Sequence, residues 1–167
     1  MGKLLKPDAY VNSIFTITPE RLINHGIYGL IIDIDNTLVA TYTKEADQKV
    51  ISYIKNLNAK GIKTVIVSNA RKERVELFCK PLGIEFVYKA LKPFGRGFDL
   101  AIEKMKLPNE KIAIVGDQLF TDVLGGNLKG LHAILIKPID KNEPFLIKVK
   151  RILEKPFVSD NSFSDKY

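Results

Sequence analysis

Short apolar runs alternate with amphipathic stretches along most of this chain. The runs fall at 28–35, 62–67, 84–88, 112–115 and 132–136. Their content of Ile and Val favours buried strands, and the apolar residues between them recur at helical spacing, as at Val50, Ile54 and Leu57. This alternation predicts a three-layer, Rossmann-like, doubly wound parallel sheet of about five strands with helices on both faces.

The two ends of the chain lie outside this alternation. Residues 1–27 predict a helical extension, with a short helix around 10–15 and another that begins at Thr18-Pro19-Glu20. Residues 144–155 predict a basic amphipathic helix, and 156–167 a loose tail. We expect one domain over 1–167, with its core at about 28–137 and the C-terminal helix and tail over 140–167. Packing on the sheet is the favoured role for that helix, and contact with an anionic membrane is the alternative.

The composition is typical of a globular protein, with 46% hydrophobic and 27% charged residues. No apolar run approaches the ~20 residues of a membrane span, and the N-terminus lacks the pattern of a secretory signal. The single cysteine, Cys79, cannot form an internal disulfide, which fits a reducing compartment. We expect a cytoplasmic protein and leave open a peripheral contact with the inner face of the membrane.

The net charge of +7 is concentrated in one part of the chain. Residues 44–106 hold fourteen Lys and Arg against seven Asp and Glu, which equals the whole excess. Such a surface favours an anionic partner, whether a phosphate ester, a lipid headgroup or a nucleic acid. A solvated lysine-rich surface explains the charge more simply than a dedicated nucleic-acid site does.

Polar side chains gather where the predicted strands end. They are Asp33 and Asp35 after the first strand, Ser68 and Asn69 after the second, Lys89, Lys92 and Arg96 after the third, and Asp117 after the fourth. The carboxyl ends of parallel strands meet at one edge, where ligands bind in doubly wound sheets. Asp33 and Asp35 share a strand face. Burying two carboxylates together costs free energy, and a bound metal ion or a catalytic role would explain why both are there. A plain turn at this point is the competing explanation.

These residues resemble the four ordered motifs of the haloacid dehalogenase superfamily of phosphatases. DIDNTL, SN, the lysine of LKP and GDQLFTD span about 28–137, with 35, 24 and 25 positions separating Asp33, Ser68, Lys92 and Asp117. The branch most similar is class IIIA, with the YqeG-type proteins and the mitochondrial phosphatidylglycerophosphate phosphatases. The intervals between the motifs leave no room for the cap domain that many members of the superfamily carry.

The resemblance implies catalytic roles for the carboxylates. Asp33 would be the nucleophile that forms an aspartyl-phosphate, and Asp35 would act as general acid and then as general base. Mg²⁺ would be held by the carboxylates of Asp33 and Asp117 and by the backbone carbonyl of Asp35. Asp122 would hold a metal-bound water or orient Lys92. Because dehalogenases and phosphonatases typically lack the second aspartate, Asp35 favours phosphate-ester chemistry.

The resemblance also implies how the phosphoryl group is bound. Ser68, Asn69 and nearby backbone N–H groups would hold its oxygens, and Lys92 would neutralise the remaining charge. Lys89 and Arg96 compete for the lysine's role, and Arg96 is a further substrate-binding candidate.

The predicted function is that of a Mg²⁺-dependent phosphomonoester hydrolase. A site without a cap is open, which suits a large substrate such as phosphatidylglycerophosphate, a phosphoprotein or a nucleic-acid end; a homo-oligomer partner is another source of cover. The alternatives are a non-catalytic nucleic-acid or ribosome-associated binding protein, and a sugar phosphotransferase or mutase. The full acidic set disfavours the first alternative, and the missing cap disfavours the second.

Overall fold

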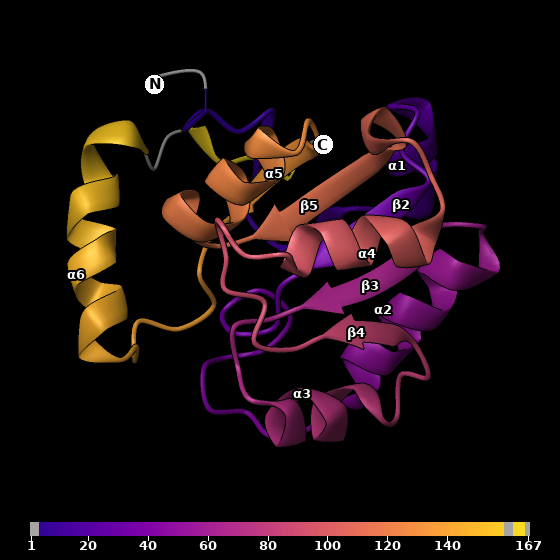
Figure 1. Cartoon of the computed structure of the whole chain (residues 1–167), viewed down its shortest axis with the longest axis horizontal. Coiled ribbons are helices and arrows are strands. Elements are labelled where there is room, and N and C mark those ends of the chain that lie inside the picture. The colour runs from indigo at the N-terminus through magenta and orange to yellow at the C-terminus, as the bar shows by residue number, and fades with distance from the viewer. Residues whose placement is uncertain (1–3, 159–161, 166–167) are drawn as a thin grey trace.

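The computed structural model describes residues 4–158 and 162–165, and its centre is a six-stranded parallel sheet with strand order β1-β6-β5-β2-β3-β4 (Figure 1). The strands are β1 (Ala9–Val11), β2 (Gly29–Ile32), β3 (Lys63–Val67), β4 (Glu85–Val87), β5 (Ile112–Gly116) and β6 (His132–Ile136). The order reverses at β2, which lies between β3 and β5 and so carries its C-terminal residues to the switch point of the sheet. The predicted doubly wound fold is confirmed, with one strand more than expected.

Helices cover both faces of this sheet. They are α1 (Pro19–Asn24), α2 (Gln48–Ala59), α3 (Lys72–Cys79), α4 (Gly97–Met105) and α5 (Leu124–Leu128), whereas the last helix, α6 (Phe145–Glu154), belongs to neither face. Side chains of α1, α2 and α3 share one core cluster with Leu30 and Ile32. Side chains of α4 share the other cluster with Ile31, because successive residues of a strand point to opposite faces. The result is the predicted three-layer arrangement.

The N-terminal segment differs from the prediction of a helix around 10–15. Ala9–Val11 forms the edge strand β1, which pairs in parallel with Ile134–Ile136, and only Ile14–Thr16 forms a 3₁₀ turn, η1. Pairing with a distant strand overrides the local pattern here, since the segment is too short for periodicity to decide. The helix predicted to begin at Thr18 is present as α1, and the Thr18 hydroxyl accepts a hydrogen bond from the Arg21 N–H at 3.3 Å.

The tail is more ordered than predicted over its described part. Ser164 forms a parallel bridge to Val11, and the Phe163 ring meets that of Tyr10 edge to face at 5.5 Å. These contacts place 162–165 beside β1. The remainder of the predicted tail at 159–161 and 166–167 lies outside the described residues.

The connections near the predicted motifs are short. Between β2 and β3 the only helix among the described residues is α2, and between β3 and β4 it is α3. Neither connection contains an inserted folded unit. This agrees with the prediction that the site has no cap domain. Within the described part of the chain, no helix has the length and apolar character needed to cross a membrane. The assignment of 1–167 to one domain stays a prediction.

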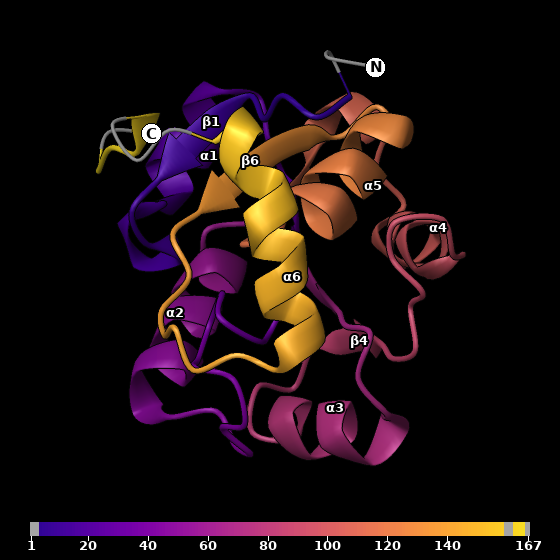
Figure 2. The same ribbon diagram turned by 90° about the vertical axis from the view of Figure 1, so that its left-hand side faces the viewer.

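Helix α6 lies across the carboxyl edge of the sheet, in front of the strand ends in Figure 2. The expectation that its apolar side packs on the sheet is wrong. Phe145 and Leu146 are 77% and 74% exposed, and the buried residue of the helix is Glu154. The helix is held by charged side chains instead, because Arg151 contacts the carboxylate and the backbone carbonyl of Asp117 directly after β5.

Candidate active site

The first site residues follow β2 directly. Asp33 continues the sheet through a hydrogen bond from its N–H to the Val115 carbonyl at 3.1 Å, and it is almost fully buried. A tight turn follows, closed by the Asn36 N–H on the Val39 carbonyl at 2.7 Å. Asn36 has φ of 59°, a left-handed conformation that Asn tolerates better than most residues. The turn of the DIDNT segment thus ends the strand with Asp33 at the centre of the sheet edge.

Lys92 joins two of the predicted acidic residues. Its ammonium donates to Asp33 Oδ1 at 2.6 Å, to Asp122 Oδ1 at 2.7 Å and to the Val67 carbonyl at 3.0 Å, and all three groups are buried. Of the three cationic candidates in this loop, Lys92 is therefore the one brought into the cluster, whereas Lys89 and Arg96 are exposed.

Two further residues fix this ion-pair network in place. Asn69 Oδ1 accepts a hydrogen bond from the Lys92 backbone N–H at 2.8 Å, so the loop after β4 is tied to the end of β3. Asp122 lies on a π-helical turn, η3 (Leu119–Val123), and packs over Gly116, where an added Cβ would lie 2.3 Å from the Asp122 Cγ. Gly116 is thus required for the close approach of this carboxylate to the end of β5.

Three buried carboxylates form a group that could hold a divalent cation. Asp33, Asp117 and Asp122 each offer a carboxylate oxygen, and these oxygens lie within 4.8 Å of one another. Asp117 Oδ1 is buried and has no hydrogen-bond partner in the described structure, although a buried carboxylate oxygen is normally satisfied. A set of hard carboxylate oxygens suits Mg²⁺ or a similar ion, so the residues present fit such a cofactor.

The electrostatics of the cluster agree with that assignment. Burial raises the pKa of Asp33 to about 7; the Lys92 ammonium counteracts this shift, and the Asp122 and Asp35 carboxylates add to it. Burial also raises the pKa of Asp117 well above its usual range, although Arg151 acts against the shift. Burial lowers the pKa of Lys92, but the Asp122 and Asp33 carboxylates outweigh it and the pKa is raised overall. Burial thus disfavours the ionised forms of Asp33 and Asp117, and a bound divalent cation would offset that cost.

The remaining predicted residues lie around this cluster with different partners. Asp35 Oδ1 pairs with the Arg74 guanidinium at 2.9 Å, and its side chain is partly exposed. Ser68 is buried, and its hydroxyl accepts from the Ala70 N–H at 3.1 Å, which leaves the hydroxyl proton available to a ligand. Arg96 precedes α4 and has no hydrogen bond to the cluster among the described residues. The roles predicted for these residues stay predictions.

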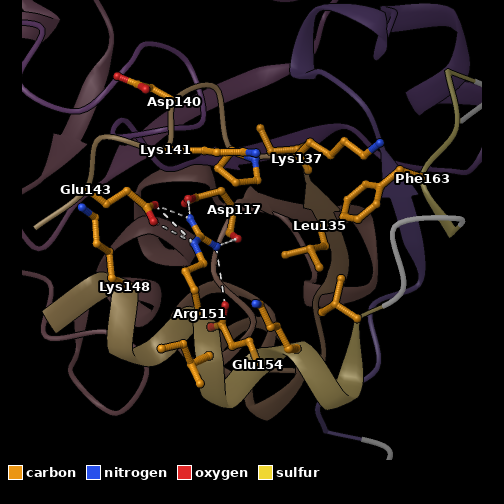
Figure 3. A pocket seen from close by; sticks show the side chains of 15 residues that line it. Asp117, Leu135, Lys137, Asp140, Lys141, Glu143, Lys148, Arg151, Glu154 and Phe163 are labelled. Atoms are coloured by element: carbon orange, nitrogen blue, oxygen red, sulfur yellow. Dashed lines mark hydrogen bonds and ion pairs between the residues drawn. The ribbon is translucent and has the colours of Figure 1, made fainter. Parts of the chain in front are cut away.

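A second charged network on α6 was missed by sequence reasoning (Figure 3). The Arg151 guanidinium donates to both the carboxylate and the backbone carbonyl of Asp117, and it pairs with Glu143 at 2.8 Å and with Glu154 at 3.5 Å. Glu143 also accepts from Asn36 Nδ2 at 2.7 Å. Arg151 belongs to no motif. The feature of the sequence that could have indicated its role is the row of polar residues on one side of α6.

Comparison with known proteins places this geometry in a family. Residues 43–128 match the family model described as haloacid dehalogenase-like hydrolase. The chain is 43% identical over 159 residues to probable phosphatase YqeG of Bacillus subtilis, covering 95% of this chain and 92% of that protein. It is 27% identical over 160 residues to phosphatidylglycerophosphate phosphatase 1 of Arabidopsis thaliana, covering 89% of this chain and 45% of that longer protein.

A solved structure shares the fold at lower identity. It is the cobalt-bound deoxy-D-mannose-octulosonate 8-phosphate phosphatase of Haemophilus influenzae, with a TM-score of 0.55 and 19% identity over 75% of each chain. The match in sequence to YqeG along nearly the full length and the match to the family model agree with the motif order and with the parallel sheet. The chain belongs to the haloacid dehalogenase-like hydrolases, and within them to the phosphatases.

Proposed function

We propose that this phosphatase hydrolyses phosphomonoesters in a Mg²⁺-dependent reaction through an aspartyl-phosphate on Asp33, and that its substrate is an anionic phospholipid such as phosphatidylglycerophosphate. The observation that carries the proposal is the position of the Lys92 ammonium between Asp33 and Asp122, with the Asp117 carboxylate beside them. This arrangement holds a nucleophile in a fixed direction and surrounds it with the groups that phosphoryl transfer needs.

The reaction follows from the two aspartates of the DIDNT segment. An oxygen of the Asp33 carboxylate attacks phosphorus as the ester P–O bond breaks, and Asp35 donates a proton to the leaving alcohol oxygen. Water then attacks the phosphorus of the aspartyl-phosphate, Asp35 accepts the water's proton, and Asp33 leaves as a carboxylate. Arg74 fixes the direction of the Asp35 carboxylate, while Lys92 keeps Asp33 aligned.

Mg²⁺ would be held by the carboxylates of Asp33 and Asp117 and the backbone carbonyl of Asp35, with Asp122 on a metal-bound water, and would supply positive charge to the transferring phosphoryl oxygens. The Ser68 hydroxyl and the backbone N–H groups after it would bind those oxygens as well. Lys92, whose ammonium stays charged, would stabilise the same negative charge.

A cavity of about 540 Å³ beside Asp117 supports an amphiphilic substrate. Lys137, Lys141 and Lys148 line it together with apolar residues that include Leu135 and Phe163 (Figure 3). Its size suits a small-molecule ligand or a lipid headgroup, and its mixture of cationic and apolar side chains suits a phosphate joined to glycerol and acyl groups. The names of two relatives as phosphatidylglycerophosphate phosphatases support the same substrate.

A phosphate-release screen tests the proposed function. The purified chain is assayed with phosphatidylglycerophosphate in mixed micelles, p-nitrophenyl phosphate, sugar phosphates, nucleotides and a phosphopeptide, each with Mg²⁺ or with EDTA. We expect release that requires Mg²⁺, with the highest kcat/KM on the lipid. Absence of release from every substrate would favour a binding protein, and transfer of the phosphoryl group to a sugar would favour a phosphotransferase.

Arg151 offers a test of the metal site that does not depend on turnover. Its guanidinium is a cation on the Asp117 carboxylate, so it opposes the binding of a second cation there. We expect Arg151→Gln to bind Mg²⁺ at least about fivefold more tightly by isothermal titration calorimetry, the lower range of coupling between linked sites. Lys150→Gln, an exposed cation on the same helix, is the matched control. Equal Mg²⁺ affinity in all three proteins would contradict a metal on Asp117.

The predicted cytoplasmic location and homo-oligomer stay predictions.

A further inference from the structure

Helix α6 has its polar and apolar sides in an unusual orientation. Arg151 and Glu154 point toward the strand ends and make the contacts that hold the helix, whereas four large apolar side chains, Phe145, Leu146, Ile152 and Leu153, are each more than half exposed. A contiguous apolar surface on a helix normally faces the core or a partner. The outer side of α6 therefore has the properties of an interaction surface.

The charges around this surface have one sign. Between 141 and 157 the exposed charged residues are Lys141, Lys148, Lys150 and Lys155. The two acidic residues of the same segment, Glu143 and Glu154, are buried against the site and are paired with Arg151. The partner of this surface therefore meets lysine and apolar side chains, and an anionic partner is complementary to it.

Other exposed apolar residues lie at the same edge of the sheet. Within the described part of the chain, every large apolar side chain that is at least half exposed lies in a segment after β2, β4 or β6. Besides those of α6 and Phe157, these are Tyr42, Leu91, Phe94 and Ile139, and each lies between the end of its strand and the start of the next helix. Lys89 and Arg96 are exposed on either side of Leu91 and Phe94.

We propose that the carboxyl edge of the sheet, with the outer side of α6 as its main element, docks on a lipid bilayer that carries anionic headgroups. A helix with large apolar side chains flanked by lysines binds in the headgroup region of such a bilayer, where the apolar groups enter the acyl boundary and the lysines meet phosphates. The exposed apolar residues belong to separate segments, α6 and the 88–96 loop, at one edge of the sheet. A bilayer is extended enough to contact both segments at the same time. The choice of lipid as the anionic partner rests on the proposed function, which places the substrate in the same bilayer.

Vesicle binding tests this proposal independently of catalysis. The full chain is sedimented with phosphatidylcholine vesicles that contain or lack 30% phosphatidylglycerol, at several salt concentrations. We expect a partition coefficient at least about tenfold higher with the anionic lipid, falling as salt rises, because each lysine near such a surface contributes to binding and is screened. Equal binding to both vesicle types, or no binding to either, would overturn the proposal.

Variants of the docking surface and matched control variants distinguish binding through α6 from non-specific binding to the vesicles. Phe145→Ser/Leu153→Ser is expected to lower the partition coefficient at least about tenfold, and Lys150→Glu at least about fivefold. Leu128→Ser on α5 and Lys55→Glu on α2 alter exposed residues away from that edge, and we expect these to bind as the parent does. All variants should keep the parent's hydrolysis of p-nitrophenyl phosphate, which reports an intact site.

Two outcomes distinguish failure of docking from failure of the proposed function. Turnover of phosphate esters with vesicle binding that the α6 variants do not change overturns docking and leaves the phosphatase assignment intact. Vesicle binding that the α6 variants abolish, in a protein that hydrolyses no lipid phosphate, supports the docking surface and overturns the lipid substrate. If size-exclusion chromatography instead shows a dimer that the α6 variants dissociate, a second copy covers this surface and the proposal is wrong.

Discussion

Asp33→Asn should lower kcat for p-nitrophenyl phosphate by roughly 10⁴-fold or more, the scale seen when a covalent nucleophile is removed. Asn has the same shape as Asp and can still accept a hydrogen bond from Lys92, so the loss reflects chemistry rather than collapse of the site. The expected loss in kcat is checked by measuring phosphate release from p-nitrophenyl phosphate at saturating Mg²⁺. Asp99→Asn, an exposed aspartate that pairs with Lys129 on the surface, should keep the parent's rate.

The covalent intermediate can be tested in the same series. Asp35→Asn removes the base for the second step, while p-nitrophenol is a good enough leaving group to depart without an acid. We therefore expect a phosphorylated protein to accumulate in Asp35→Asn after acid quench, visible by intact-mass spectrometry as an added phosphoryl group that the double variant with Asp33→Asn lacks. A double variant that is phosphorylated equally would place the nucleophile elsewhere.

The sequence was sufficient to predict five of the six strands and the edge of the sheet at which the buried carboxylates gather. Strands such as Gly29–Ile32 and Ile112–Gly116 are buried on both faces and so appear as continuous apolar runs. Asp33, Ser68 and Asp117 each follow such a run, and parallel pairing brings their positions to one edge without any further information. The structure then distinguished Lys92 from Lys89 and Arg96, because the path of the loop after β4 decides which side chain reaches inward.

The parts that sequence reasoning missed depend on contacts between distant segments. β1 exists because three residues near the N-terminus pair with β6, and no local pattern of that length separates a strand from a helix. The orientation of α6 was predicted from its apolar side alone, although the strand ends beneath it present charged groups. Arg151 illustrates the point, since its partners Asp117 and Glu143 come from two other segments.

Lys92→Met should lower the free energy of unfolding at pH 8 by about 3–5 kcal/mol, because removing one partner of a buried ion pair leaves an uncompensated buried charge. Here the lost ammonium leaves the buried carboxylates of Asp33 and Asp122 without the cation that pairs with them. Met fills a similar volume, so the change is mainly electrostatic. Chemical denaturation monitored by circular dichroism measures the effect, and Lys89→Met in the exposed part of the same loop is the matched control.

The pH dependence of this loss has a defined sign. Burial already raises the pKa of Asp33 to about 7 against the influence of Lys92, and the variant should raise it further. A carboxyl whose folded-state pKa lies above its unfolded value favours the fold when protonated and loses that contribution as pH rises. The deficit of Lys92→Met should therefore shrink toward pH 5 and grow toward pH 8, and Lys92→Met/Asp122→Asn should recover much of it at pH 8. A deficit that is independent of pH and unchanged in the double variant would mean that Lys92 stabilises the fold through packing rather than through its charge.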